Sequence, residues 1–392
     1  MKFLHISDLH IGKVVNDFSM LEDQRFILEQ IQGMAEENAV ETIIIAGDIY
    51  DRAIPPAEAV ALFDSFLTGL YRMGIPVLMI SGNHDSPERL SFAEGLLKEQ
   101  GVHIAGVKRQ ELTTVIVPEG GNTLHKASSP LETQFVLMPF FKPAQVGVRT
   151  TQEAVEAVLR EYWQKEKEAG NVKRNRVLVT HFFVTNSGKE PELSDSETTI
   201  HVGGLDNVDV SLFEGFDYVA LGHIHRPQQM GEAAVWYAGS PLKYSFGEVN
   251  QTKTALFVTL GEQGLEEVRQ LPLRPLREMR KIKGSLREIL EEAGTDNGGR
   301  HDYIQAHLTD RGELIDPIGT IRSVYPNVMQ IVREETAGGR EGSASVTSAS
   351  GPLLDQKDCT GLFADFYREV REEELSVEGR QVITDIIKEV EL

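Results

Sequence analysis

Residues 3–10 read Phe-Leu-His-Ile-Ser-Asp-Leu-His, an apolar strand pattern that runs directly into two side chains able to bind a metal. The same arrangement recurs after four other short apolar runs. These later segments are Gly47-Asp48-Ile49-Tyr50-Asp51, Gly82-Asn83-His84-Asp85, Thr180-His181 and Gly222-His223-Ile224-His225. In an open α/β sheet the carboxyl ends of the strands share one edge, where ligand crevices form. We therefore expect the five segments to meet at a single site.

Short apolar runs rich in Val and Ile predict buried strands. They are Phe3–Ile6, Thr42–Ala46, Val77–Ile80, Val115–Val117, Phe135–Met138, Val177–Val179, Tyr218–Leu221, Val235–Ala238 and Ala255–Leu260. Helical patterns occupy residues 20–37, 56–73, 88–99 and 152–167. Strands that first alternate with helices and then follow one another closely indicate a layered α/β domain over residues 1–265.

The residue types at these strand ends define the class of metal. Seven side chains are candidate ligands: Asp8, His10, Asp48, Asn83, His181, His223 and His225. Imidazole nitrogens and oxygen donors without a thiolate suit divalent manganese, iron or zinc. Seven ligands are too many for one six-coordinate ion but suit two ions that share a carboxylate. Two metals about 3.5–4 Å apart can bind a hydroxide and phosphate oxygens, so the pattern predicts phosphoester hydrolysis.

The composition excludes several classes of protein. With 392 residues and about 100–200 residues per domain, the chain is expected to form two or three domains. A single cysteine, Cys359, excludes an intrachain disulfide and a cysteine-based zinc site, which indicates a reducing compartment. No apolar run reaches the roughly 18 residues of a membrane span, and the N-terminus lacks a signal peptide. We therefore expect a soluble intracellular protein.

The chain after residue 265 divides into three parts. Alternating strand and helix patterns predict a small α/β domain at residues 266–335. Residues 336–351 are expected to form a flexible linker, because thirteen of these sixteen residues are Gly, Ser, Ala or Thr. Residues 352–392 contain two amphipathic helix patterns, with an apolar stripe suited to docking in a partner's groove. The alternative is that these helices pack back on their own domain.

The strand-end motifs, in this order, resemble those of the calcineurin-like metallophosphoesterase superfamily. The match is closest at Ile6–Lys13 and Tyr237–Phe246, and the added small domain and C-terminal helices resemble its double-strand-break repair nucleases. The resemblance implies a layered α-β-β-α sandwich with a capping domain. It also implies a manganese-dependent 3′-to-5′ exonuclease on duplex DNA that opens hairpins as an endonuclease, in DNA repair, recombination and replication. ATP hydrolysis by a partner subunit would gate access to duplex ends.

The resemblance also assigns roles to individual residues. Asp8, His10 and His225 would hold the first metal, Asn83, His181 and His223 the second, and Asp48 would bridge the two. His84 occupies the position of a proton donor or charge stabiliser that acts on the phosphate. Archaeal and eukaryotic relatives have a histidine where this chain has Asp51, whereas phosphatases of the superfamily have an aspartate that orients the catalytic histidine. We therefore expect Asp51 to accept a hydrogen bond from one nitrogen of His84 and fix its tautomer.

Two other functions remain open at this point. A phosphoprotein phosphatase is one alternative, since Gly47–Arg52 comes close to the sequence of those enzymes, although Asp85 stands where they prefer glutamate. A non-catalytic scaffold for an ATPase partner is the other, and the complete set of seven ligand positions argues against it.

The partners expected from the sequence are DNA, an ATPase subunit and a second copy of the chain. Residues 269–287 carry seven basic residues and one acidic residue, in a chain with a net charge of −21. This local excess is typical of a surface that contacts phosphates, although a solvated strand face is the alternative. The resemblance implies that residues 352–392 bind the ATPase and that helices of the first domain form a homodimer. It places the protein in the cytoplasm, associated with the nucleoid.

Overall fold

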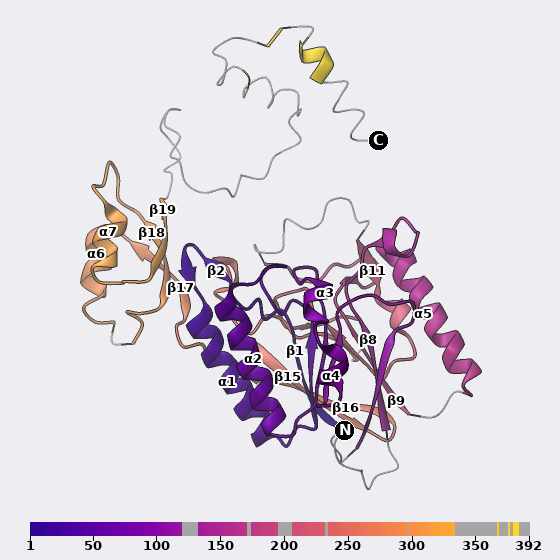
Figure 1. Ribbon diagram of the computed structural model, residues 1–392. Helices are drawn as coiled ribbons and strands as arrows, with labels where there is room; N and C mark the ends of the chain where they lie inside the picture. The colour runs from indigo at the N-terminus through magenta and orange to yellow at the C-terminus, as the bar shows by residue number, and fades with distance from the viewer. Residues whose placement is uncertain are drawn as a thin grey trace. The chain divides into compact units, whose positions relative to one another are not determined.

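The computed structural model describes residues 1–119, 132–170, 174–194, 206–231, 234–296, 298–333, 367, 375–376 and 379–383 (Figure 1). The chain divides into two compact units, Met1–Glu334 and Glu335–Leu392. The expected linker at 336–351 and most of the expected helical segment at 352–392 lie outside the described residues. The described positions 379–383 are helical. In the described part of the chain, no helix is long and apolar enough to cross a membrane.

The first sheet has six strands in the order β16-β15-β1-β4-β5-β6. Its bounds are β1 (Lys2–Ile6), β4 (Thr42–Ala46), β5 (Val77–Ile80), β6 (Val102–Ala105), β15 (Thr254–Gly261) and β16 (Gly264–Pro272). Strands β1, β4, β5 and β6 are parallel, so their carboxyl ends lie at one edge. The expected strands of this sheet are confirmed. Strands β6 and β16 were not expected from the sequence.

The second sheet also has six strands, in the order β13-β14-β12-β9-β8-β7. Its bounds are β7 (Thr113–Pro118), β8 (Glu132–Met138), β9 (Asn175–Thr180), β12 (Tyr218–Leu221), β13 (Gln228–Gln229) and β14 (Val235–Tyr237). Strands β8, β9, β12 and β14 are parallel, and β7 and β13 are antiparallel edge strands. Four strands of two or three residues lie outside the two large sheets: β2 (Val14–Val15), β3 (Phe18–Ser19), β10 (Phe183–Thr185) and β11 (Asn207–Asp209).

The two sheets face each other across a largely apolar layer that includes Phe3, Phe135 and Tyr218, with His5 hydrogen-bonded to the Tyr218 hydroxyl. Helices cover the outer face of each sheet (Figure 1). Helices α1 (Leu21–Glu37) and α2 (Ala57–Arg72) pack on the first sheet, and α5 (Thr151–Glu168) packs on the second. Each layer follows from the sequence, since strands buried on both faces are continuously apolar and the helices are apolar on one face. The α-β-β-α sandwich is therefore confirmed.

One expected helix is divided. Residues 88–99 form two short helices, α3 (Pro87–Leu90) and α4 (Glu94–Lys98), in place of one continuous helix. Ala93 between them has a φ of 57°, a left-handed conformation that cannot continue a right-handed helix. The periodic apolar pattern could not reveal this interruption.

The small domain has three parallel strands, β17 (Met279–Gly284), β18 (Tyr303–Leu308) and β19 (Val328–Arg333), with helices α6 (Leu286–Glu292) and α7 (Pro317–Arg322). Its predicted order of elements is confirmed. The predicted boundary at 265/266 is wrong, because β16 pairs with β15 in the first sheet as far as Pro272. Strand β16 is an edge strand with many charged, exposed residues, so its sequence does not form the apolar run that predicts a strand. The small domain therefore begins after Pro272.

A buried carboxylate joins the small domain to helix α1. Asp23 is completely buried and accepts hydrogen bonds from the Tyr303 hydroxyl and from Arg277 Nη1, each at 2.7 Å. One buried carboxylate therefore accepts from both donors. This charge-assisted contact fixes the junction between the first domain and the small domain.

Candidate metal centre

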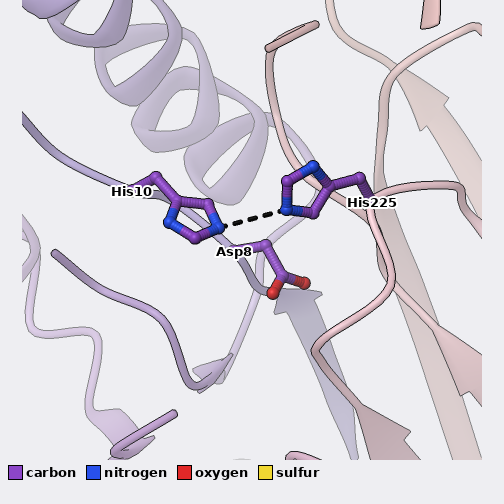
Figure 2. A group of neighbouring side chains, drawn as sticks. All are labelled: Asp8, His10 and His225. Atoms are coloured by element: carbon purple, nitrogen blue, oxygen red, sulfur yellow. Dashed lines mark hydrogen bonds between the residues drawn. The ribbon is translucent and has the colours of Figure 1, made fainter. Parts of the chain in front are cut away.

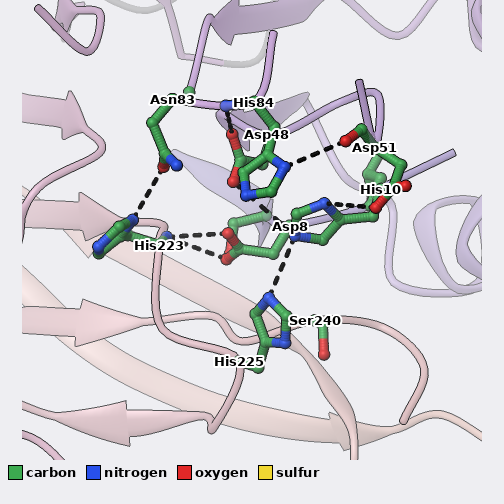
Figure 3. A network of polar contacts seen from close by, with 12 residues as sticks. Asp8, His10, Asp48, Asp51, Asn83, His84, His223, His225 and Ser240 are labelled. Carbon is green, nitrogen blue, oxygen red and sulfur yellow. Dashed lines mark hydrogen bonds and ion pairs between the residues drawn. The ribbon is translucent and has the colours of Figure 1, made fainter. Parts of the chain in front are cut away.

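Five strand ends meet at one place between the two sheets, as the sequence predicts (Figure 3). Strands β1, β4 and β5 of the first sheet supply Asp8 and His10, Asp48, and Asn83. Strands β9 and β12 of the second sheet supply His181, His223 and His225. The strands are parallel within each sheet, so their polar residues follow the buried apolar runs at a common edge. The site therefore lies where the two sheets adjoin.

The first group of ligand types is Asp8, His10 and His225 (Figure 2). One potential ligand atom from each lies within 4.8 Å of the others. The Nε2 atoms of His10 and His225 face each other at 3.1 Å. All three side chains are buried. Two imidazole nitrogens and a carboxylate aimed at one point form a suitable set for a divalent cation.

The second group surrounds Asn83 and Asp48. The Asn83 Oδ1 atom lies 3.1 Å from His181 Nε2 and 3.0 Å from His223 Nδ1. The Asp48 Oδ2 atom lies 3.3 Å from His181 Nε2 and 3.8 Å from His10 Nε2. Asp48 thus lies between the two groups, which is the position that a bridging carboxylate requires. The structure brings all seven candidate ligands together.

The backbone at four of these residues is strained. Asp8, His10, Asp48 and His223 have φ values of 52°, 44°, 49° and 100°. Non-glycine residues rarely adopt positive φ, and such conformations cost of order 1–3 kcal/mol each. Strain of this kind is concentrated at functional sites, where the surrounding fold compels it. The strands therefore end in sharp turns that aim the side chains inward.

Two glycines allow the strand ends to approach each other. A Cβ atom at Gly82 would overlap the Asp48 carboxylate, and one at Gly222 would overlap the Ala46 carbonyl and lie 2.6 Å from His181 Nδ1. The lack of a side chain at these two glycines therefore permits the close approach before Asn83 and His223. Of the three glycines that precede ligands, only Gly47 also uses a positive φ, 87°.

Burial and opposite charges together shift the protonation of the site. Desolvation raises the pKa of Asp8 to about 6, and His181 and His225 oppose this rise. Desolvation alone would lower the pKa of His181, but Asp48 and Asp8 raise it to about 9. Asp48 shows the converse effect, since His181 holds its pKa well below the usual value despite burial. Desolvation lowers the pKa of His10, which keeps that imidazole neutral.

Hydrogen bonds from outside the cluster fix its imidazoles. His181 Nδ1 donates to the Ala46 carbonyl at 2.7 Å, which leaves Nε2 directed at Asp48 and Asn83. The backbone N–H of His223 donates to the Asp8 carboxylate at 2.9 Å. The orientation of the His181 ring is therefore set by the backbone at the end of β4, and the His223 main chain holds the Asp8 carboxylate.

The predicted hydrogen bond from His84 to Asp51 is present, but its acceptor is the main-chain carbonyl of Asp51 and not the carboxylate. His84 Nδ1 donates to the backbone carbonyl of Asp51 at 3.1 Å, whereas the Asp51 carboxylate accepts from Lys13 Nζ at 2.7 Å. The physical reason is that the carboxylate is closer to a full cation, while the carbonyl in the same turn satisfies the imidazole. Asp51 still fixes the His84 tautomer, but through its main chain.

Several residues that support the site were missed by the sequence analysis. Gln24 on α1 is buried, donates to the His10 carbonyl at 2.7 Å and accepts from the Gly12 N–H at 3.0 Å. The Asp85 carboxylate accepts from the backbone N–H groups of Ile49, Tyr50 and Gly82. These side chains tie together the loops that carry the ligands. Asp85 could have been found, because it follows His84 directly, but nothing in the sequence marks Gln24.

The donors fit divalent cations. The described cluster contains imidazole, carboxylate and amide oxygen donors, and His10 Nδ1 is buried without a hydrogen-bond partner. A cation bound by the Nε2 atoms of His10 and His225 would replace the hydrogen bond between them with two coordinate bonds. Together, the fold and the cluster define a metal-dependent phosphoesterase.

Comparison with known families agrees with this class. Residues 1–227 match the calcineurin-like phosphoesterases, and residues 275–371 match a family described as the type 5 capsule protein repressor C-terminal domain. The chain therefore belongs to the calcineurin-like phosphoesterase family.

A curated relative narrows the similarity further. The SbcD subunit of the nuclease SbcCD from Staphylococcus epidermidis is 30% identical over 389 residues, which cover 99% of this chain and 97% of that protein. The resemblance to repair nucleases, and among them to SbcD, is thus confirmed along nearly the whole chain.

Two solved structures share the fold at lower similarity. A dimetal phosphatase from Danio rerio is 13% identical, with a TM-score of 0.40, over 70% of this chain and 98% of that chain. The protein TT1561 of Thermus thermophilus is also 13% identical, with a TM-score of 0.39, over 70% of this chain and 99% of that one.

Metal affinity should rise with pH between about 6 and about 9. Asp8 ionises near the lower value, and His181 loses its proton near the upper one, so below each value a metal must displace the proton first. Titration calorimetry with Mn²⁺ at pH 7, in two buffers of different ionisation enthalpy, should show net proton release. An affinity that stays constant over this range, with no proton released, would contradict the assigned protonation states.

Proposed function

We propose that this chain is a two-metal DNA nuclease that cleaves duplex ends as a 3′-to-5′ exonuclease and opens hairpins as an endonuclease. The observation that carries the proposal is the position of Asp48 between two groups of ligand types. A shared carboxylate suits two cations at the spacing used for in-line displacement at phosphorus. The similarity to a nuclease subunit over 99% of the chain supports DNA as the substrate.

The residues divide between metal binding and proton transfer. Asp8, His10 and His225 would hold one ion, Asn83, His181 and His223 the other, and Asp48 both. When bound, two divalent ions, with manganese expected, lower the pKa of a water and neutralise phosphate oxygens. His84 donates through its backbone N–H to Asp48 and through Nδ1 to Asp51. Its Nε2 atom is then the one that would contact the phosphate, and it would protonate the leaving oxygen when the ring carries protons on both nitrogens.

Two substitutions separate these roles. His84→Leu should keep both metals and lose about 10²–10⁴-fold in turnover, the usual contribution of a general acid. Asp48→Asn should lose metal and turnover together, because it alters the bridging ligand. Both are measured as cleavage of end-labelled hairpin DNA with Mn²⁺, Mg²⁺ or a chelator, alongside Mn²⁺ binding by calorimetry. Cleavage by His84→Leu at the wild-type rate would exclude its proposed role.

The same assay distinguishes a nuclease from a phosphatase. Wild-type protein is incubated in parallel with a phosphopeptide under the same metal conditions. Release of phosphate from the peptide without cleavage of either hairpin or linear duplex DNA would overturn the nuclease proposal.

The basic stretch at 269–287 is less available to DNA than its sequence indicates. Ion pairs within the protein engage Arg277 with Glu22 and Asp23, Arg280 with Asp296 and Asp302, and Arg287 with Glu291. Lys281 projects from the exposed side of β17. We therefore assign the proposed phosphate contact to the face of β17 that carries Lys281. The positive charges of arginines that are paired with carboxylates are already partly neutralised.

Charge reversal at Lys281 tests this surface. Lys281→Glu should weaken DNA binding and reduce the slope of its salt dependence by about 1, because one phosphate contact is lost. Hydrolysis of a small phosphodiester should stay unchanged. Lys167→Glu is the matched control, because it reverses an exposed charge on α5, away from the small domain (Figure 1). Equal effects of the two variants on binding would argue against a specific contact.

An SbcC-type ATPase subunit is the proposed partner of residues 352–392. The relative's name describes a subunit of a larger nuclease, SbcCD, and the match to the second family extends to residue 371. A homodimer through helices of the first domain is proposed as well. The exposed apolar side chains Ile54, Phe92 and Leu96, which lie before α2 and beside α3 and α4, support a docking face there.

Removal of residues 352–392 tests the partner assignment. The truncated chain should fail to form a complex with the ATPase subunit in size-exclusion chromatography, because the proposed docking helices are absent. Manganese-dependent hairpin cleavage should persist, since every candidate ligand lies before residue 226. Retention of the complex would assign the ATPase contact to another surface.

A further inference from the structure

Glu248 is a fully buried carboxylate behind the candidate metal ligand His225. It lies in a short 3-10 turn, Phe246–Glu248, that follows β14 by eight residues. Its Oε1 atom lies 3.5 Å from His225 Nδ1, on the side of the ring opposite to the Nε2 atom that faces His10. The imidazole therefore lies between a buried carboxylate and the candidate metal cluster.

A buried lysine holds this carboxylate in place. Lys253 Nζ pairs with Glu248 Oε2 at 2.6 Å and donates to the His225 carbonyl at 2.8 Å and to Ser240 Oγ at 3.0 Å. The Ser245 hydroxyl donates to Glu248 Oε1 at 3.1 Å. Ion pairs in the protein interior are costly unless their geometry is well satisfied. Burying both charges costs desolvation free energy, which is consistent with a functional role for the Glu248–Lys253 pair beside His225.

We propose that Glu248 is a positioning residue that accepts a hydrogen bond from His225 Nδ1–H and so directs the unprotonated Nε2 of that ring at the first metal. This inference rests on the proposed metal site and deepens it. A carboxylate behind a ligating histidine fixes the tautomer, orients the ring and makes the nitrogen a stronger donor. Lys253 completes the arrangement, because it holds Glu248 through its side chain and His225 through its carbonyl.

Glutamine cannot replace glutamate here, although it has nearly the same shape. The Glu248 carboxylate faces three donor groups, Lys253 Nζ at Oε2 and both His225 Nδ1 and the Ser245 hydroxyl at Oε1. An amide offers one oxygen and one NH₂ group, so the donors at one of these two positions would face an N–H. If the NH₂ group faced His225, Nδ1 would become the acceptor and the proton would move to Nε2, where it blocks metal binding.

The experiment measures Mn²⁺ binding to the full-length protein by calorimetry and electron paramagnetic resonance. Glu248→Gln should weaken one of two sites by about 10–100-fold and leave the other within error, as loss of such a carboxylate does elsewhere. Glu262→Gln is the control, because it makes the same chemical change at an exposed position in the turn between β15 and β16. Equal affinities of Glu248→Gln and wild type at both sites would overturn the proposal.

Two further measurements separate positioning from a general structural effect. In a His225→Ala background, Glu248→Gln should cause no additional loss of affinity, because it acts through that ring. Nitrogen-15 spectra of the metal-free protein should show the His225 ring changing from the Nδ1–H to the Nε2–H tautomer in Glu248→Gln. An unchanged tautomer or additive losses would assign Glu248 to folding alone.

A milder variant keeps the test decisive if Glu248→Gln melts below the assay temperature. Ser245→Ala removes one donor to Glu248 Oε1 and retains the ion pair with Lys253. It should weaken the same site a few-fold, the usual effect of one hydrogen bond, and an unchanged first site would count against the proposal. Failure of the wild-type protein to bind two Mn²⁺ ions would instead refute the proposed function, so the two failures are distinguishable.

Discussion

The Asp48 carboxylate is the contact on which the site depends. One of its oxygens accepts from the His84 backbone, and the other lies close to both His10 and His181. These partners come from three strand ends in two different sheets, so Asp48 can occupy this position only if the sheets pack face to face. The apolar layer between the sheets sets that packing. The absence of a side chain at Gly82 lets the carboxylate approach the neighbouring loop.

The arrangement of the ligands around Asp48 is, by itself, unfavourable for folding. Buried carboxylates and imidazoles lose their hydration, and four of the ligand residues adopt strained backbone conformations. The surrounding structure offsets these costs with hydrogen bonds from fixed groups, such as Gln24 to the loop at His10 and Asp85 to the loop at Ile49 and Tyr50. Strained backbone and buried charge are found at the site, whereas the surrounding strands and helices follow the usual sequence patterns. This contrast is typical of a functional centre in a stable scaffold.

The sequence predicted those parts of the site that depend on local pattern. Ligand residue types directly follow apolar runs, and parallel strands bring such ends together, so the convergence of the seven ligands could be inferred. The acceptor of His84 could not be predicted, because main-chain and side-chain oxygens of Asp51 share one position in the sequence and only the packing of Lys13 decides between them. Gln24 and Glu248 were missed because each contacts the site from a distant segment. Strand β16 was missed because an exposed edge strand needs few apolar residues.

Charge places a further constraint on how this chain can meet a polyanion. At −21 its long-range field repels DNA, but screening at physiological salt limits that repulsion to about 8 Å. At close range Arg277 and Arg280 of the small domain are held by neighbouring carboxylates. Two divalent cations would reverse the negative charge that Asp8 and Asp48 give the site. The metal centre would then be the strongest local attraction for a phosphate, so the ions proposed to activate hydrolysis would also position the substrate.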